Sequence, residues 1–344
     1  MDTITHSLLG AVVVRSMFPA QHSAHPFSNR QRLLAGALAG ALPDLDYIAA
    51  GVDPMVFLTL WHRSITHSLV LLPLWVLLAG IMLAFVFRQY REWRYLTLLA
   101  GVALVSHILS DLITVYGTQI LAPLSTWRAS IGTTFIIDPW FTLVVLAGFV
   151  AGFSNTSDRL PRASLALLLG YLVLQGGLKQ QALSIARDHA ARDAIPAVRV
   201  AAFPQPFSPF NWKVVVEADG YYDIAYLSLS GGYADTGERK GFWDQVRDTY
   251  REPARMQWLR QNRFGAPGAE AEQVERSWNN EQLADFRRFA ELPVLYRIDQ
   301  DGAGSCVWFT DLRFVLPFLT PPFRYGLCRA GPQADWRLER LQGP

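Results

Sequence analysis

A histidine and an aspartate inside an apolar segment are the residues of this sequence best placed to do chemistry. His107 and Asp111 interrupt the apolar run Leu96–Ile113, and their spacing of four puts them one turn apart on one face of a helix. Ionisable side chains are costly inside a membrane and are functional candidates there. Metal binding is one interpretation of this pair, and a structural hydrogen bond is the other.

Two aspartates follow a proline where a second helix should end. Asp44 and Asp46 come directly after Pro43, and aspartates in this position are often turn or cap residues. Two positions apart on a helix, they would point in nearly opposite directions. We therefore expect one of them to bind a metal directly and the other to orient a ligand.

Two histidines lie five positions apart just before the longest apolar run. On one regular helix the side chains of His62 and His67 would diverge by about 140°. Both can face one site only if a helix begins between them, with Thr66 or Ser68 as its cap. His62, His67 or both are therefore candidate ligands.

His6 stands early in the first predicted helix and should emerge at the same membrane face as the other candidates. His22, His25 and His189 lack such company, and we interpret them as solvated loop or surface residues. Imidazole and carboxylate ligands suit zinc, manganese or iron. A set this large could hold one or two ions, and it comprises His6, Asp44, Asp46, His62, His67, His107 and Asp111.

The elements that must position these residues are apolar helices. Ser68–Phe87 contains twenty residues without a charge, long enough to cross a bilayer. Further candidate spans are Leu96–Ile113, Phe135–Phe153 and Ala163–Leu178. Thr5–Phe18 and Leu33–Ala50 are too short to be clear spans; they are rich in small residues that allow close helix packing, including Gly10, Gly36 and Gly40. Residues 1–180 are therefore predicted to form an α-helical membrane bundle of four to six helices.

The arginines predict the orientation of this bundle. If six helices alternate in direction, one side of the membrane collects eight arginines and the other only two. The metal site and the tail then face the extracytoplasmic side of a bacterial-type inner membrane. The first group is Arg15, Arg30, Arg32, Arg88, Arg91, Arg94, Arg159 and Arg162, and the second is Arg63 and Arg128.

Residues 181–344 have the composition of a soluble α+β domain. After a Pro-rich connector, Lys213–Glu217 and Tyr221–Ser230 are predicted to form a hairpin. Cys306 and Cys328, the two cysteines of the 344-residue chain, could form a disulfide outside the cytoplasm or remain free thiols. The net charge of +2 gives no reason to expect a nucleic-acid partner. The other predicted elements are helices over Trp243–Asn262 and Ala269–Glu291 and a second hairpin of Val294–Asp299 with Cys306–Phe314.

The ordered motifs carry a family resemblance over roughly residues 1–180. They are Asp2-x-x-Thr5-His6, Pro43-Asp44-x-Asp46, His62-Arg63-x-x-Thr66-His67-Ser68, His107-x-x-x-Asp111, Thr114-x-Tyr116-Gly117-Thr118 and Asp138-Pro139. This pattern resembles the YdjM-like membrane-bound metal-dependent hydrolases. That family is in turn similar to zinc-dependent phospholipase C and the fungal single-strand nucleases. The resemblance implies metal ligands at His6, Asp44, His62 or His67, His107 and Asp111. A second His-x-x-x-Glu/Asp pair is absent from the predicted bundle, which favours one or two metal ions over three.

The resemblance implies metal-assisted hydrolysis, for which zinc is the first candidate ion. Whichever of Asp44 and Asp46 does not bind the metal, most naturally Asp46, could serve as general base. Arg63 could hold a phosphate or simply lie near lipid head groups. The position of the site favours a phospholipid or a lipid-linked phosphate as substrate. Two other functions remain open: ion or proton handling by the His/Asp cluster, and a metal-stabilised scaffold.

Overall fold

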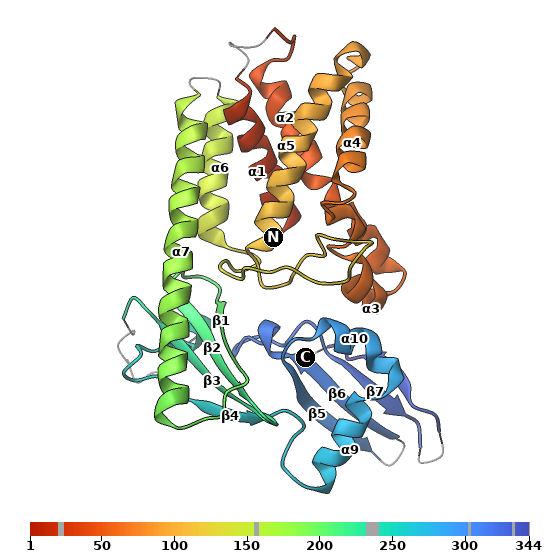
Figure 1. Ribbon diagram of the computed structural model, residues 1–344, viewed down its shortest axis with the longest axis vertical. Coiled ribbons are helices and arrows are strands. Elements are labelled where there is room, and N and C mark those ends of the chain that lie inside the picture. The colour runs from red at the N-terminus through yellow and green to blue at the C-terminus, as the bar shows by residue number, and fades with distance from the viewer. Residues whose placement is uncertain (20–23, 155–157, 232–240, 302–303, 332–333, 344) are drawn as a thin grey trace. The chain divides into compact units, whose positions relative to one another are not determined.

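Two compact units make up the computed structural model of this chain (Figure 1), which describes residues 1–19, 24–154, 158–231, 241–301, 304–331 and 334–343. The first unit comprises residues 1–177 and 204–209, and the second comprises residues 178–203 and 210–344. One long helix, Arg159–Arg192, contributes its first part to the first unit and its last part to the second.

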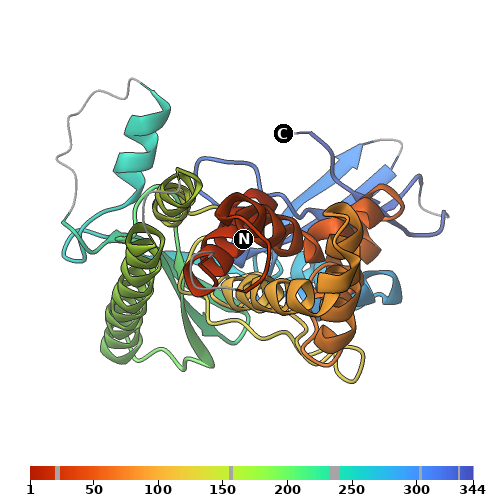
Figure 2. The same ribbon diagram turned by 90° about the horizontal axis from the view of Figure 1, so that it is seen from above.

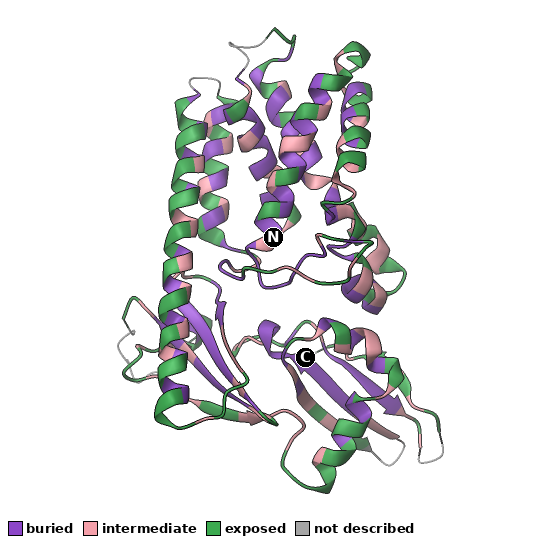
Figure 3. Ribbon diagram, viewed as in Figure 1, coloured by how far each residue is buried: buried purple, intermediate pink, exposed green. Residues whose placement is uncertain are grey.

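The described part of the first unit is helical. Its α-helices are α1 (Thr3–Met17), α2 (Asn29–Ala41), α3 (Pro54–Val56), α4 (Leu72–Val86), α5 (Trp93–Leu112), α6 (Pro139–Phe153) and the first part of α7 (Arg159–Arg192). Short 3-10 or π turns connect them: η2 (Pro43–Gly51), η3 (Phe57–Trp61), η4 (Ile65–His67) and η5 (Tyr90–Glu92). Helices α1, α2 and α5 pack against one another (Figures 1 and 2), and Figure 3 shows that buried residues gather on them.

Glycines bring α1 and α2 into backbone contact, as their spacing predicted. A Cβ atom on Gly10 would overlap the carbonyl oxygen of Gly36, and one on Gly40 would lie 2.7 Å from the carbonyl oxygen of His6. Side-chain caps fix where the helices begin. The Asp2 carboxylate accepts a hydrogen bond from the Thr5 amide at 3.0 Å. The close contact of Gly40 with His6 places the start of α1 beside the end of α2.

The apolar helices differ from the predicted spans in length. Within the described residues, one helix is long and apolar enough to cross a membrane, Tyr90–Leu112. The helix expected over Ser68–Phe87 begins only at Leu72, because residues 65–67 form a separate 3-10 turn, and it spans 15 residues. The segment expected over Leu33–Ala50 bends by 45° before Pro43, where a proline disfavours continued helix. If each bent helix pair is counted as one span, up to three spans are present.

Two four-stranded sheets form the core of the second unit. Strands β2 and β3 and strands β3 and β4 pair antiparallel, and so do β5 to β8 in sequence order. The first sheet is β1 (Arg199–Pro204), β2 (Asn211–Ala218), β3 (Tyr221–Ser228) and β4 (Leu259–Asn262). The second is β5 (Pro293–Asp301), β6 (Gly304–Asp311), β7 (Tyr325–Arg329) and β8 (Arg337–Arg340). The short helices are α8 (Phe242–Thr249), α9 (Ala269–Trp278), η6 (Glu281–Leu283), α10 (Ala284–Phe289) and η7 (Leu312–Phe314).

The predicted elements of this unit were partly right. Both hairpins are present, although Gly302 of the second predicted turn lies outside the described residues. The helix predicted over Trp243–Asn262 was wrong beyond Thr249: Leu259–Asn262 pairs with β3 as strand β4. The helix predicted over Ala269–Glu291 is broken after Trp278, where the Asn280 side chain caps a new turn.

The two cysteines of the second unit form a disulfide. Cys306 of β6 lies directly opposite Cys328 of β7, with their Cα atoms 4.1 Å apart. The sequence left open a disulfide or two free thiols, and the structure has the disulfide.

Candidate metal centre

Four segments of the first unit bring buried imidazoles and carboxylates together at one place. Helix α1 supplies His6, the 3-10 turn η2 supplies Asp44, η4 supplies His67, and α5 supplies His107 and Asp111. All five side chains are buried. The helix start expected between the two histidines of segment 62–67 is met only by the short 3-10 turn Ile65–His67. The α-helix α4 begins at Leu72, after both histidines, and neither Thr66 nor Ser68 is its N-cap.

Four ligand atoms of this cluster lie close to one another. The Nε2 atoms of His67 and His107 are 3.0 Å apart. They lie 3.3 and 3.6 Å from Asp111 Oδ2 and 3.6 and 3.7 Å from Asp44 Oδ1. Nitrogen and oxygen ligands about 2.0–2.1 Å from a tetrahedral zinc ion are about 3.3–3.4 Å from each other. The five distances, from 3.0 to 3.7 Å, lie near this value, so these side chains are suited to hold a metal ion.

The partners of the outer ring nitrogens fix which nitrogen carries the proton. Nδ1 of His107 lies 2.6 Å from the carbonyl oxygen of Gly40, which can only accept, so Nδ1 is protonated and Nε2 has a lone pair. Nδ1 of His67 lies 2.9 Å from Thr66 Oγ1, whose hydroxyl donates to Asp46. The same reasoning leaves a lone pair on Nε2 of His67. Two lone pairs thus face each other, an arrangement that a cation between them stabilises.

Two buried carboxylate oxygens of the cluster have no hydrogen-bond donor. They are Asp44 Oδ2 and Asp111 Oδ2. A buried polar atom without a partner is costly, and a buried charge is normally paired or bound to a metal. These oxygens are buried, negatively charged acceptors without a donor, and a divalent cation would satisfy them.

His6 forms a second metal-capable group with His107 and Asp111. Its Nδ1 lies 3.0 Å from Ser110 Oγ, and that hydroxyl donates to the backbone oxygen of His107. His6 Nδ1 is therefore the donor, and its Nε2 lone pair lies 2.9 Å from Asp111 Oδ1. The His6 ring also stacks on the ring of His107, with the ring centres 3.7 Å apart.

The third group joins Asp44 to Asp46 and His62, with ligand atoms within 4.8 Å of one another. Asp46 Oδ1 lies 3.1 Å from His62 Nδ1, and Asp46 Oδ2 accepts a hydrogen bond from the backbone nitrogen of Arg63 at 3.3 Å. Asp46 is less buried than the other members of the cluster. It thus contacts two neighbouring segments and stands at the open side of the site. Its predicted role as a base stays a prediction.

Arg63 contacts Asp111 and helps to orient its carboxylate. It adopts a left-handed backbone conformation with φ of 57°, which non-glycine residues rarely use outside special sites. Its buried guanidinium lies 3.0 Å from Asp111 Oδ1, donates to Thr114 Oγ1 at 2.7 Å and covers the ring of Tyr116. The backbone nitrogen of Met1 also contacts Asp111 Oδ1. These contacts orient Asp111 so that its other oxygen faces His67 and His107; phosphate binding by Arg63 stays a prediction.

The remaining histidines have other environments. His25 is exposed, as predicted, and its Nδ1 lies 2.6 Å from a Glu92 oxygen. The surface prediction for His189 was wrong: in the second unit it is buried, stacks on Trp258 with ring centres 3.7 Å apart, and contacts Asp223. A tryptophan that packs over the ring from a distant segment cannot be inferred from local sequence. His22 lies outside the described residues.

The sequence reasoning missed three supporting groups of the centre. They are the carbonyl of Gly40, the hydroxyl of Ser110 and the hydroxyl of Thr114. Ser110 on α5 and Thr114 just beyond its end each follow a candidate ligand by three positions, so this spacing was an available signal. The hydroxyl of Tyr116 donates to the backbone oxygen of Leu58.

The family described as YdjM inner membrane protein matches residues 1–182, more than half of the chain. The Bacillus subtilis protein YfhP is 26% identical over 196 residues, which cover 55% of this chain and 59% of YfhP. This chain therefore spans less than two thirds of the length of that relative. No solved structure matches, so the likeness to phospholipase C and the nucleases stays a prediction. The match over residues 1–182 shows that this chain belongs to the YdjM inner membrane protein family.

Proposed function

We propose that this chain is a multi-pass inner-membrane hydrolase that uses one or two divalent metal ions, with zinc as the first candidate. Its proposed substrate is a phosphoester of a lipid or of another membrane-associated molecule. One observation carries the proposal: the Nε2 atoms of His67 and His107 lie 3.0 Å apart and within 3.3–3.7 Å of buried carboxylate oxygens of Asp44 and Asp111. An ion held by these residues supplies Lewis acidity, since it can acidify a water molecule towards a pKa of about 7 and polarise a phosphoryl group.

The proposed residue roles follow from the contacts. His67, His107, Asp44 and Asp111 are the proposed ligands of the first ion, and His6 offers a further ligand atom beside His107 and Asp111. The group of Asp44, Asp46 and His62 offers a place for a second ion. Asp46 is the proposed general base because it is the least buried carboxylate of the cluster and already accepts hydrogen bonds. A substrate would reach the centre from the side of Asp46, since the other members are buried.

The proposed topology places the centre and the second unit outside the cytoplasm. Two observations support it. The arginine-rich loops of the sequence mark the opposite side of the bundle as cytoplasmic. The disulfide between Cys306 and Cys328 is of a kind that persists in oxidising compartments and is rare in the cytosol.

The test is metal analysis of the purified full-length protein together with activity measurements. We expect roughly stoichiometric zinc or another divalent ion in the wild type and its loss from His107→Ala and His67→Ala. His25→Ala is the matched control, because His25 is exposed and lies outside the cluster. Hydrolysis should be measured on phospholipids and soluble phosphodiesters. Wild-type protein without bound metal, or turnover unchanged in His107→Ala, would contradict the proposal and favour ion or proton handling.

A further inference from the structure

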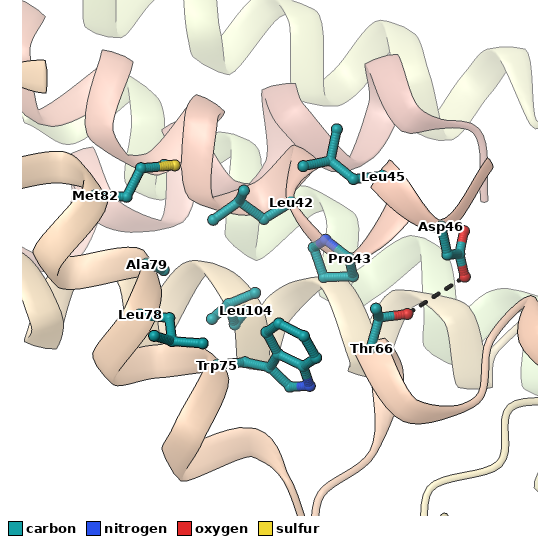
Figure 4. A pocket seen from close by; sticks show the side chains of 10 residues that line it. All are labelled: Leu42, Pro43, Leu45, Asp46, Thr66, Trp75, Leu78, Ala79, Met82 and Leu104. Carbon is teal, nitrogen blue, oxygen red and sulfur yellow. Dashed lines mark hydrogen bonds between the residues drawn. The ribbon is translucent and has the colours of Figure 1, made fainter. Parts of the chain in front are cut away.

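An apolar groove of about 430 Å³ in the first unit ends at the metal centre. Its walls come from the end of α2, from η2, from α4 and from α5. Figure 4 shows two polar side chains, Asp46 and Thr66, at one end and Met82 at the other. The rest of the lining is apolar. The volume lies in the range of about 300–1,000 Å³ that small-molecule sites occupy.

The groove runs along α4. Trp75, Leu78, Ala79 and Met82 line it, and their spacing of i, i+3, i+4 and i+7 is that of one helix face. At 1.5 Å per residue this face extends over about 10 Å. The small side chain of Ala79 leaves room in the middle of the face. On the outer side of α4, exposed apolar residues such as Leu77 fit contact with lipid.

The polar end of the groove belongs to the metal centre. Asp46 offers a ligand atom within 4.8 Å of ligand atoms on Asp44 and His62. The Thr66 hydroxyl connects Asp46 to the imidazole of His67, which belongs to the central group. A molecule with an apolar body and a polar end, seated in this groove, would therefore present its polar end to the metal ligands.

We propose that the groove binds one hydrocarbon chain of a lipid substrate and places the ester of that lipid at Asp46. This inference rests on the proposed function and names the substrate class: a phosphate-bearing lipid rather than a water-soluble phosphoester. The groove is lined by a helix within the residues that match the membrane family, lies beside exposed apolar side chains of that helix, and includes Asp46 of the metal centre. A water-soluble ester would leave this apolar lining unfilled and exposed, at a cost in binding free energy.

The test fills the groove and follows a lipid directly. Full-length protein is placed in phosphatidylcholine vesicles with a small fraction of phosphatidic acid whose acyl chain ends in a diazirine. Leu78→Trp narrows the groove, while Leu77→Trp makes the same change at a neighbouring position outside the lining. We expect photolabelling at Leu104, the buried groove residue of α5, to fall about tenfold in Leu78→Trp. Leu77→Trp should keep the wild-type labelling.

Labelling needs no turnover, so its failure is separate from that of the proposed function. Equal labelling at Leu104 in both variants, labelling confined to the outer face of α4, or a cross-link to a second copy of the chain would overturn the inference. Normal groove labelling without hydrolysis of any phosphoester would instead overturn the proposed function. If Leu78→Trp loses its bound metal and does not fold, Met82→Trp repeats the test at the far end of the groove.

Discussion

Ser110→Ala is a sharp test of the proton positions in the centre. The Ser110 hydroxyl accepts from His6 Nδ1 at 3.0 Å and donates to the backbone oxygen of His107. Without it, His6 can keep a buried N–H without an acceptor, at a cost of about 1–3 kcal/mol. It can also move the proton to Nε2, which lies 2.9 Å from Asp111 Oδ1 and then no longer offers a lone pair. Both routes weaken metal binding.

The expected loss follows from two independent magnitudes. Removing the partner of a metal-binding histidine typically lowers metal affinity about 10- to 100-fold, which corresponds to about 1.4–2.7 kcal/mol. This range overlaps the cost of about 1–3 kcal/mol for a buried His6 N–H that has lost its acceptor. Affinity is measured by competition with a chelator of known zinc affinity. Ser106→Ala is the control, since Ser106 lies one turn earlier on α5 and donates only to Ala103 of the same helix. Equal zinc affinity in both variants and the wild type would refute the assigned proton positions.

Three further predictions concern packing, metal removal and the second unit. Gly10→Ala should lower the melting temperature and the metal content, because the new Cβ overlaps the Gly36 carbonyl, whereas Gly170→Ala meets open space and should not. Chelation of the metal should lower the melting temperature of the wild type but not of His107→Ala, because the ion binds only the folded centre; equal shifts would contradict this. Burial lowers the pKa of Lys213 to about 7, so between about pH 7 and 10 the unfolded chain binds a proton that the folded chain lacks. The free energy of unfolding should therefore rise with pH by up to about 1.4 kcal/mol per pH unit relative to Lys213→Met, and parallel pH profiles would contradict it.

The sequence predicted the members of the centre but could not predict its distances. Spacing on a helix placed His107 and Asp111 on one face, and simple geometry required a helix break between His62 and His67. The shared face is present, and the break consists of the 3-10 turn Ile65–His67, with α4 beginning after both histidines. The sequence could not show which oxygen of Asp111 faces the imidazoles, because Arg63 and the Met1 nitrogen, which orient it, come from distant segments. Such orientation is a property of packing between elements.

The wrong predictions for the second unit also arise from contacts between distant segments. The segment Leu259–Asn262 carries no alternating apolar pattern and becomes a strand because β3 offers a free edge. Strand formation depends on the partner more than on intrinsic preference. His189 and Asp193 showed the spacing of a metal pair, yet His189 is held by Trp258 and Asp223 in the second unit. A spacing of four residues therefore indicates a shared helix face and does not by itself distinguish a ligand from a packed side chain.

The direction of the hydrogen bonds separates a metal centre from a proton relay. A relay requires imidazoles that pass a proton in at one nitrogen and out at the other. Here Nδ1 of each imidazole lies at hydrogen-bond distance from an oxygen outside the cluster. The pairs are His6 with Ser110, His67 with Thr66, and His107 with the carbonyl of Gly40. Their Nε2 atoms converge on Asp111 instead of continuing a chain. Nε2 of His67 and of His107 thus face carboxylate oxygens of Asp111 and Asp44, a donor set that suits a divalent cation. The geometry therefore favours metal binding over relay for the same set of residues.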